Sequence, residues 1–227
     1  MSLNTLMRSS KWSVMTRVRH PVSHTVAVVW AALAAISIVV MSVSVADGDV
    51  GEFERRVFDW INGWPDWLEW PLWVLQQPGV LLFPVIVGAM LWLVTGRQRL
   101  FWAFFVIMPA KLIIERVVVK QLVERERPYT SIGDDIELRG HQMVGLSFPS
   151  GHTTTAFATA VLMMAFLPER WRWLPLLIAG AVGVARIYVG EHNPLDVLAG
   201  AMLGTALAML SRAFILSGDE VEGSSAT

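Results

Sequence analysis

The stretch PSGHTTTAFATAVLMMAF, residues 149–166, places a proline, a serine, a glycine and a histidine directly before an apolar run. Such a run favours a helix in a lipid bilayer, where ionisable side chains are costly and are usually kept for function. His152 therefore has two interpretations. It is either an incidental residue at a helix boundary or part of a reactive site at the membrane surface.

The composition of the whole chain indicates a membrane protein. Of the 227 residues, 54% are hydrophobic and only 16% are charged, whereas about a quarter of the residues in a soluble domain are charged. The formal net charge of -1 identifies no partner. The chain has no cysteine, which excludes disulfides, thiolate metal sites and cysteine nucleophiles.

Six apolar segments approach or reach the length of about 20 residues that crosses the hydrocarbon core of a bilayer. They are residues 25–46, 79–96, 100–119, 152–168, 173–190 and 195–216. We therefore predict an all-α, polytopic membrane protein with six transmembrane helices, in which residues 25–216 form one domain. A basic N-terminal segment, residues 1–24, precedes this domain, and an acidic, disordered tail, residues 217–227, follows it.

The first apolar segment resembles a signal peptide, because it follows basic residues and ends near the small residues Ser44-Val45-Ala46. Its apolar run of about 20 residues is longer than the roughly 7–15 residues of a signal's core region. We interpret the segment as an uncleaved first transmembrane helix.

The basic residues between the segments predict the orientation of the chain. Loops rich in lysine and arginine stay in the cytoplasm, which assigns both termini and two loops to the inside. Besides the N-terminal segment, the residues that decide this are Arg97, Arg99, Arg170, Arg172 and Arg212. The connections near residues 47–78, 120–151 and 191–194 then lie outside. We expect a multi-pass protein of a bacterial plasma membrane.

Three polar clusters fall on this external side of the predicted topology. They read KQLVERERP (120–128), PSGH (149–152) and ARIYVGEHNPLD (185–196). Lys120, Arg127 and Arg186 are cations that suit the oxygens of a phosphate. Ser150 and Gly151 precede a helix whose first amides can bind an anion, and Gly151 lets the backbone approach closely.

Two histidines supply the chemistry that such a phosphate site needs. On a helical turn, the carboxylate of Asp196 accepts the proton of one ring nitrogen of His192 and leaves the other nitrogen free to attack phosphorus. His152, on the opposite side, would protonate the leaving oxygen, so a bell-shaped pH–rate profile is expected. Each residue also has a simpler interpretation. Asp196 can cap a helix, and the histidines, Lys120 and Arg127 can be polar residues at the membrane interface.

The pattern K-x6-RP, then PSGH, then R-x5-H-x3-D resembles the signature of the type 2 phosphatidic acid phosphatase superfamily of membrane lipid phosphatases. The resemblance covers the third to the sixth apolar segment. It implies that His192 is a nucleophile that forms a phosphohistidine, that His152 is the general acid, and that no metal or cofactor is used. It also implies that the phosphate is held by Lys120, Arg127 and Arg186.

One position departs from this pattern. Many members have serine before the arginine of the third motif, where this chain has Ala185. We expect a lower rate from the missing hydroxyl.

Further charges lie in or near the third apolar segment. At about 100° per residue, Arg116 lies close to the face of Lys120 and is predicted to add positive field, whereas Lys111 lies on the opposite face and is predicted to pair with Glu115. The acidic run Asp134-Asp135-Ile136-Glu137 is interpreted as a solvated loop and not as a metal site.

Two patterns outside the motifs predict contacts with lipid or with helices. The first external connection carries tryptophans that indicate an aromatic belt at headgroup depth or, alternatively, a gate for lipid entry; these are Trp60, Trp64, Trp67, Trp70 and Trp73. Gly200 and Gly204 form a small-xxx-small pair that favours close helix packing.

The sequence therefore predicts an enzyme that hydrolyses a phosphate or diphosphate on a lipid. A polyprenyl diphosphate, phosphatidylglycerophosphate and phosphatidic acid fit the motifs equally well. Two alternatives remain open: a lipid phosphotransferase that uses the same phosphohistidine, and a non-catalytic phospholipid carrier. The expected partners are the lipid phosphate and the bilayer, with no nucleic acid, and the sequence leaves the oligomeric state open.

Overall fold

The computed structural model describes residues 22–46, 50–133, 135–139 and 144–216. The predicted tail, residues 217–227, almost all of the predicted basic segment and Asp134 lie outside the described residues. The described part is helical without strands, which confirms the all-α fold class. Its elements are α3 (His24–Ser44), α4 (Glu52–Asn62), η1 (Asp66–Leu68), α5 (Glu69–Leu75), η2 (Gln77–Gly79), α6 (Phe83–Thr95), α7 (Gln98–Phe105), α8 (Ile107–Leu112), η3 (Ile113–Val119), α9 (Lys120–Val123), α10 (Pro128–Ser131), α11 (Gly151–Met164), η4 (Glu169–Trp171), α12 (Leu174–Tyr188), α13 (Pro194–Ser211) and η5 (Arg212–Leu216).

Each of the six predicted apolar segments contains at least one helix. By length and composition, two helices in the described part of the chain can cross a membrane, His24–Ser44 and Pro194–Leu216, and a third apolar helix, Phe83–Thr95, is shorter. The third segment is divided into α7, α8, η3 and α9, with Pro109 inside α8. Six transmembrane helices therefore remain a prediction.

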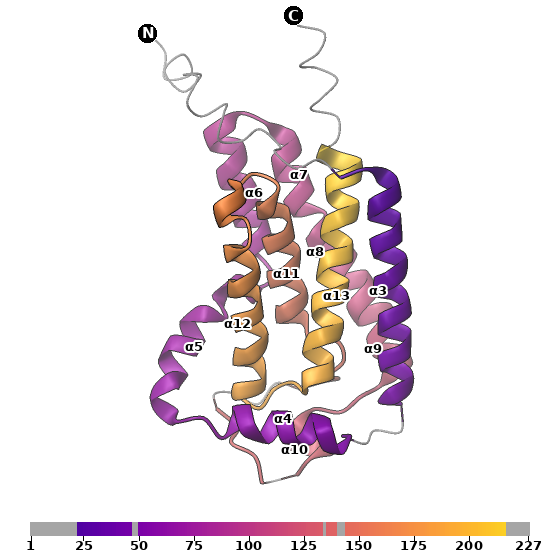
Figure 1. Ribbon diagram of the computed structural model, residues 1–227, viewed down its shortest axis with the longest axis vertical. Helices are drawn as coiled ribbons and strands as arrows, with labels where there is room; N and C mark the ends of the chain where they lie inside the picture. The colour runs from indigo at the N-terminus through magenta and orange to yellow at the C-terminus, as the bar shows by residue number, and fades with distance from the viewer. Residues whose placement is uncertain (1–21, 47–49, 134, 140–143, 217–227) are drawn as a thin grey trace, which may run out of the picture.

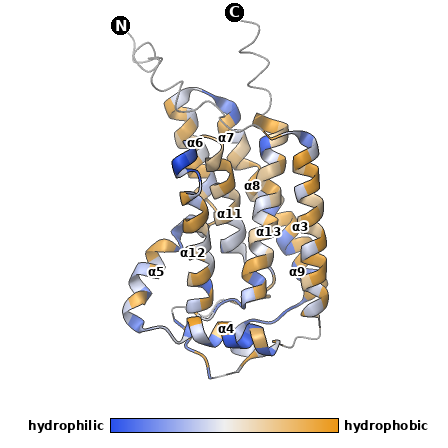
Figure 2. Cartoon of the chain, in the orientation of Figure 1, coloured by the Kyte–Doolittle hydropathy of each residue, from blue (hydrophilic) through white to orange (hydrophobic). Residues whose placement is uncertain are grey.

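The long helices stand side by side, with α11 in the centre between α12 and α13 (Figure 1). Both ends of the described chain lie at the same end of this bundle, because the rings of His24 and Phe214 are 4.8 Å apart. Hydrophobic residues make up much of the helices (Figure 2), and many of them are exposed on the outer surface, among them Val43, Leu93 and Leu177. An apolar exterior of this kind suits the hydrocarbon of a bilayer.

The two glycines of α13 allow it to pack closely on α11. A Cβ added to Gly200 would lie 2.5 Å from the carbonyl oxygen of Ser150. One added to Gly204 would overlap the carbonyl oxygen of Thr154. Both approaches are closer than atoms can pack, which confirms the predicted role of the glycine pair in helix packing.

Helix α4 crosses the end of the bundle that is opposite to the chain ends (Figure 1). It is amphipathic: Glu54, Phe58 and Ile61 are buried against the bundle, whereas Phe53 and Trp60 are exposed. Three more tryptophans on η1 and α5 are exposed: Trp67, Trp70 and Trp73. Whether this aromatic surface is a belt or a gate stays a prediction.

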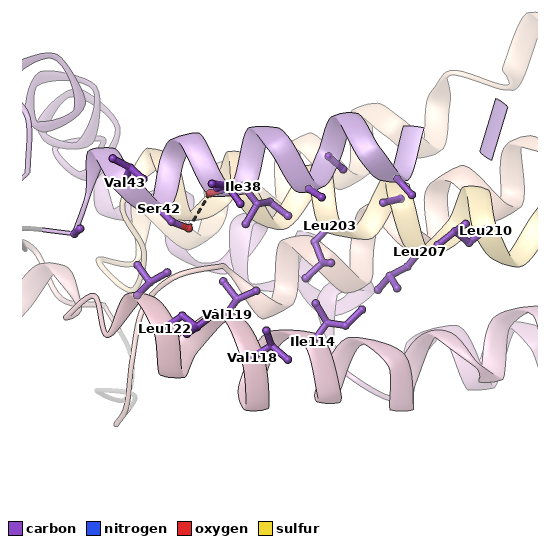
Figure 3. Close-up of a pocket in the computed structure, with 17 residues that line it drawn as sticks. Ile38, Ser42, Val43, Ile114, Val118, Val119, Leu122, Leu203, Leu207 and Leu210 are labelled. Atoms are coloured by element: carbon purple, nitrogen blue, oxygen red, sulfur yellow. Dashed lines mark hydrogen bonds between the residues drawn. The ribbon is translucent and has the colours of Figure 1, made fainter. Parts of the chain in front are cut away.

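An apolar groove of about 550 Å³ runs between α3, α13 and the segment from η3 to α9. Figure 3 shows Ile38, Leu203 and Leu122 among the side chains that surround it. Among the described residues of the lining, Ser42 is the one polar residue, and its hydroxyl donates a hydrogen bond of 2.7 Å to the carbonyl oxygen of Ile38. The groove thus presents a surface suited to hydrocarbon.

Candidate phosphate site

A polar cavity of about 460 Å³ lies where the three sequence motifs meet, at the α4 end of the bundle. Six of the eight predicted site residues line it: Lys120, Arg127, Gly151, His152, Arg186 and His192. The other two, Ser150 and Asp196, are buried next to lining residues and are not part of the cavity wall. The fold thus brings together cations, histidines and a helix start from segments far apart in the sequence.

His192 lies in the short loop between α12 and α13. Gly190 adopts a φ of 79°, a left-handed conformation that favours glycine, and turns the chain there. The Nδ1 atom of His192 is 3.6 Å from Oδ2 of Asp196 and 3.4 Å from the hydroxyl oxygen of Ser147. These contacts lie on the Nδ1 side, so Nε2 is the nitrogen available to a ligand in the cavity.

Asp196 is fully buried and has a partner on each oxygen. Its Oδ2 accepts a hydrogen bond of 2.8 Å from the backbone N–H of Asn193 and another from the hydroxyl of Ser147. Its Oδ1 accepts one of 2.9 Å from Arg125. The interpretation of Asp196 as a residue at a helix start and its interpretation as the partner of His192 are therefore compatible.

The three predicted cations of the cavity are each held by partners in the protein, and Arg127 and Arg186 share one of them. Lys120 donates a hydrogen bond of 2.6 Å to the carbonyl oxygen of Leu146. Arg127 contacts Glu191 through both the carbonyl and the carboxylate, at 3.0 and 2.5 Å. Arg186 donates to the amide oxygen of Gln76 at 2.7 Å and lies 3.8 Å from the same Glu191 carboxylate. Fixed cations of this kind can bind the oxygens of a phosphate without reorganising.

Glu191 and Gln76 were not predicted from the sequence. Glu191 is fixed between Arg127 and Arg186 and therefore orients both guanidinium groups. Gln76 comes from the connection before η2, which packs on α11. Glu191 lies at an unspecified position of the third motif and Gln76 lies outside the motifs, so the role of each depends on contacts across the fold.

The start of α11 forms the wall of the cavity between the cations. A Cβ added to Gly151 would lie 2.7 Å from Oε1 of Glu115, so the backbone approaches the charged side chains as closely as a glycine allows. The hydroxyl of Ser150 accepts a hydrogen bond of 3.0 Å from Thr153, and no capping hydrogen bond from the Ser150 side chain to the helix is present. Gly151 and His152, in the first turn of α11, line the cavity, and the start of a helix favours an anion.

The predicted pair of Lys111 and Glu115 is confirmed, with 3.1 Å between Nζ and Oε2. The prediction that Lys111 lies on the face opposite to Lys120 is wrong, because both line the cavity and both contact Glu115. The reason is η3, a π-helix of seven residues between them. A π-helix closes i→i+5 hydrogen bonds and so turns less per residue than the α-helix assumed for the prediction. Arg116 also lines the cavity; its effect on activity stays a prediction.

Two buried residues in the motif loops were missed. Ser147 lies two residues before the second motif, and its hydroxyl donates a hydrogen bond to Asp196. Ala185, where many family members have serine, has no hydroxyl to offer. Arg125 lies in KQLVERERP, where Arg125 and Arg127 are buried and Glu124 and Glu126 are exposed. This alternation is typical of an extended segment with one buried face, and it is the signal that could have identified Arg125.

The burial of His192 predicts how stability depends on pH. Burial lowers the pKa of His192 to about 3, although the hydrogen bond and the charge of Asp196 act in the opposite direction. An unfolded histidine has a pKa of about 6.5, so the unfolded chain binds more protons than the folded one between these values. The free energy of unfolding should therefore fall as the pH drops from 8 to 5, by about 2 kcal/mol from this residue.

Thermal unfolding in detergent at pH 8 and pH 5 tests this expectation. For a chain of this size, about 2 kcal/mol corresponds to a shift in Tm of about 4–8 °C. His192→Asn should remove this part of the acid-induced decrease, because asparagine does not titrate. An equal decrease in both proteins would contradict a neutral, buried His192.

Comparison with known proteins gives a family and two similar folds. Residues 99–217 match the model of a family described as the PAP2 superfamily. A crystal structure of a transmembrane PAP2 type phosphatidylglycerolphosphate phosphatase from Bacillus subtilis has a TM-score of 0.67 at 21% identity and covers 82% of this chain and 96% of that chain. Aquifex aeolicus LpxE has a TM-score of 0.55 at 22% identity and covers 72% of this chain and 96% of that chain.

Curated relatives are similar over part of their length. The bacitracin transport permease protein BcrC of Bacillus licheniformis is 35% identical over 115 residues, 51% of this chain and 56% of that protein. An undecaprenyl-diphosphatase of Sulfolobus acidocaldarius is 33% identical over 120 residues, 52% of this chain and 57% of that protein. Phosphatidylglycerophosphatase B of Escherichia coli is 26% identical over 204 residues, 67% of this chain and 80% of that protein. The chain thus spans a little over half the length of the first two relatives.

Proposed function

This chain belongs to the PAP2 superfamily, and on that premise we propose that it is a membrane lipid phosphatase that acts through a phosphohistidine. The observation that carries the proposal is one cavity lined by His192, His152 and the three predicted cations Lys120, Arg127 and Arg186. Its relatives include proteins named undecaprenyl-diphosphatase and phosphatidylglycerophosphatase B. Both names describe the removal of phosphate from a lipid.

In the proposed first step, Nε2 of His192 attacks the phosphorus of the bound substrate. The P–N bond forms as the bond to the leaving oxygen breaks, and His152 donates its proton to that oxygen. Asp196 accepts the Nδ1–H of His192 and stabilises the positive charge that develops on the ring. In the second step, water attacks the phosphohistidine, His152 accepts a proton of that water, and the P–N bond breaks to release phosphate.

The cavity stabilises charge during both steps. Lys120, Arg127 and Arg186 face the non-bridging oxygens, and the amides at the start of α11 add further donors. These positive groups need no metal ion to neutralise the phosphate, so we propose metal-independent hydrolysis. We further propose that this end of the bundle faces the outside of the cell, with both chain termini in the cytoplasm.

An apolar groove on α11 lies next to this cavity and suits a lipid tail. His152, Ala156, Ala160 and Met163 recur on one face of α11, at spacings of three or four residues. The last three line an apolar groove of about 400 Å³ between α6, α11 and α12. The η2 turn lies between the two spaces, because Gly79 lines the cavity and Pro78 lines the groove. We propose that the phosphate occupies the cavity and that the tail extends along α11.

Narrowing this groove should affect substrates according to the length of their tails. Ala160→Leu fills space that about two methylene groups of the tail would occupy, each worth about 0.8 kcal/mol, so KM for a long-tailed lipid phosphate should rise about tenfold. Hydrolysis of a short, water-soluble phosphate should stay unchanged. Ala35→Leu, in the groove of Figure 3, is the matched control. Equal KM values for the two variants would contradict this path.

The function itself is tested by phosphate release from purified protein in detergent with EDTA. The panel contains a polyprenyl diphosphate, phosphatidylglycerophosphate and phosphatidic acid. Release that persists in EDTA, with trapping of acid-labile, base-stable label on the protein, is the expected result. Loss of release in EDTA would contradict metal independence. Label that appears on a lipid acceptor would favour the phosphotransferase, and binding without release would favour the carrier.

A further inference from the structure

A buried arginine outside the cavity connects the surface helix α4 to the carboxylate behind His192. Arg125 is 1% exposed and is not part of the cavity wall. Its Nη1 and Nη2 atoms donate to the two carboxylate oxygens of Glu54, at 3.0 and 2.7 Å. The same Nη1 lies 2.9 Å from Oδ1 of Asp196. Arg125 therefore bridges two buried acids and cannot contact a phosphate in the cavity.

The bridge determines the orientation of Asp196. Oδ2 of Asp196 faces His192 and is also held by Ser147 and the Asn193 N–H. Oδ1 has Arg125 as the hydrogen-bond partner that the structure gives it. Without that partner the buried carboxylate would have an uncompensated oxygen, and it would rotate or take up a proton to satisfy it. Either change would alter the hydrogen bond that fixes the tautomer of His192.

Glu54 holds the other end of the bridge in two ways. Besides Arg125, it accepts a hydrogen bond of 2.9 Å from the backbone N–H of Leu195, in the first turn of α13. A carboxylate at this position also interacts favourably with the positive end of the helix. Glu54 thus fixes Arg125 and the start of the helix that carries Asp196. It does so from α4, whose opposite face exposes Phe53 and Trp60.

We infer that Glu54 and Arg125 are positioning residues for His192: they hold Asp196 in the orientation in which it accepts the Nδ1–H. The surface helix α4 is then part of the catalytic apparatus. This inference rests on the proposed function, because the bridge positions Asp196 for catalysis only if His192 is the nucleophile. It adds two residues that contact neither the phosphate nor the histidine.

Kinetics of Glu54→Gln and Arg125→Gln test the inference. Both variants should lower kcat about 10- to 100-fold and change KM less than about twofold, because the cations of the cavity remain. Arg125→Lys should retain more activity than Arg125→Gln, because it keeps the positive charge, although it loses the bidentate contact with Glu54. The matched control is Glu52→Gln on the same helix, whose side chain is 82% exposed and pairs with Arg56. It should behave as the wild type.

A double-mutant cycle separates positioning from folding. If Glu54 acts through Asp196, Glu54→Gln should cost little further activity in an Asp196→Asn protein. An equal loss of kcat with and without Asp196 would overturn the inference. A loss that is fully explained by a lower Tm and less folded protein would also overturn it.

Nitrogen-15 NMR of histidine-labelled protein gives a readout without any substrate. The wild type should show His192 as one tautomer with the proton on Nδ1, and His192→Asn identifies its signal. Arg125→Gln should give a mixture of tautomers, and an unchanged spectrum would contradict the inference. If the wild type releases no phosphate and Arg125→Gln still changes the tautomer of His192, the proposed function is refuted and the positioning role remains.

Discussion

Replacing His192 with alanine is expected to lower the rate of phosphate release by about 10⁴-fold or more. Among the described residues of the cavity, no other side chain has a free ring nitrogen and a second ring nitrogen that faces a buried carboxylate. The substitution removes the nucleophile and leaves the cations in place. Binding of a lipid phosphate should therefore persist, whereas covalent labelling of the protein should disappear.

The control is His24→Ala, which removes a histidine from the far end of the bundle, where its ring packs 4.8 Å from that of Phe214. It should retain wild-type kcat and KM. Release from His192→Ala that stays within tenfold of the wild type would exclude His192 as the nucleophile. The same result with intact labelling would direct the search to His152.

Replacing His152 with alanine should have an effect that depends on the leaving group. A general acid contributes about 10²–10⁴-fold when the leaving group is a strongly basic oxygen. The leaving group of phosphatidic acid is the diacylglycerol alkoxide, so this substrate should show the full loss of rate. The leaving group of a polyprenyl diphosphate is the polyprenyl monophosphate, which is a much weaker base, so the loss of rate should be about tenfold or less.

Single-turnover rates on the two lipids, measured with the wild type and His152→Ala, give this ratio directly. Equal losses on both substrates would show that His152 acts on binding or on water attack and not on the leaving oxygen. Gly79 packs on His152, so a Tm measurement is needed to exclude a displaced η2 turn.

The meeting of the three motifs at one end of the bundle could be predicted from the sequence, because the alternation of apolar segments and basic loops fixes which helix ends share a face. The residues behind the site could not. Glu54 and Arg125 are 71 positions apart, and nothing in the composition of α4 distinguishes Glu54 from the exposed Glu52. Only the packing of α4 across the helix ends makes one of them buried.

The face assigned to Lys111 was wrong for a different reason. The prediction assumed a constant turn of about 100° per residue, and the sequence IIERVVV gives no sign of a change in hydrogen bonding. The pairing with Glu115 was nevertheless predicted correctly, since it depends on a spacing of four residues that a small change in turn does not disrupt.

The π-helical segment η3 has a consequence for how relatives of this chain are aligned. Between Lys111 and Lys120 the direction of a side chain depends on hydrogen-bond type as well as on residue count. A relative with one residue fewer and an ordinary α-helix in this segment could direct both lysines to the same cavity. A gap in an alignment here would then preserve the chemistry, whereas an ungapped alignment could pair a cavity residue with one that faces lipid.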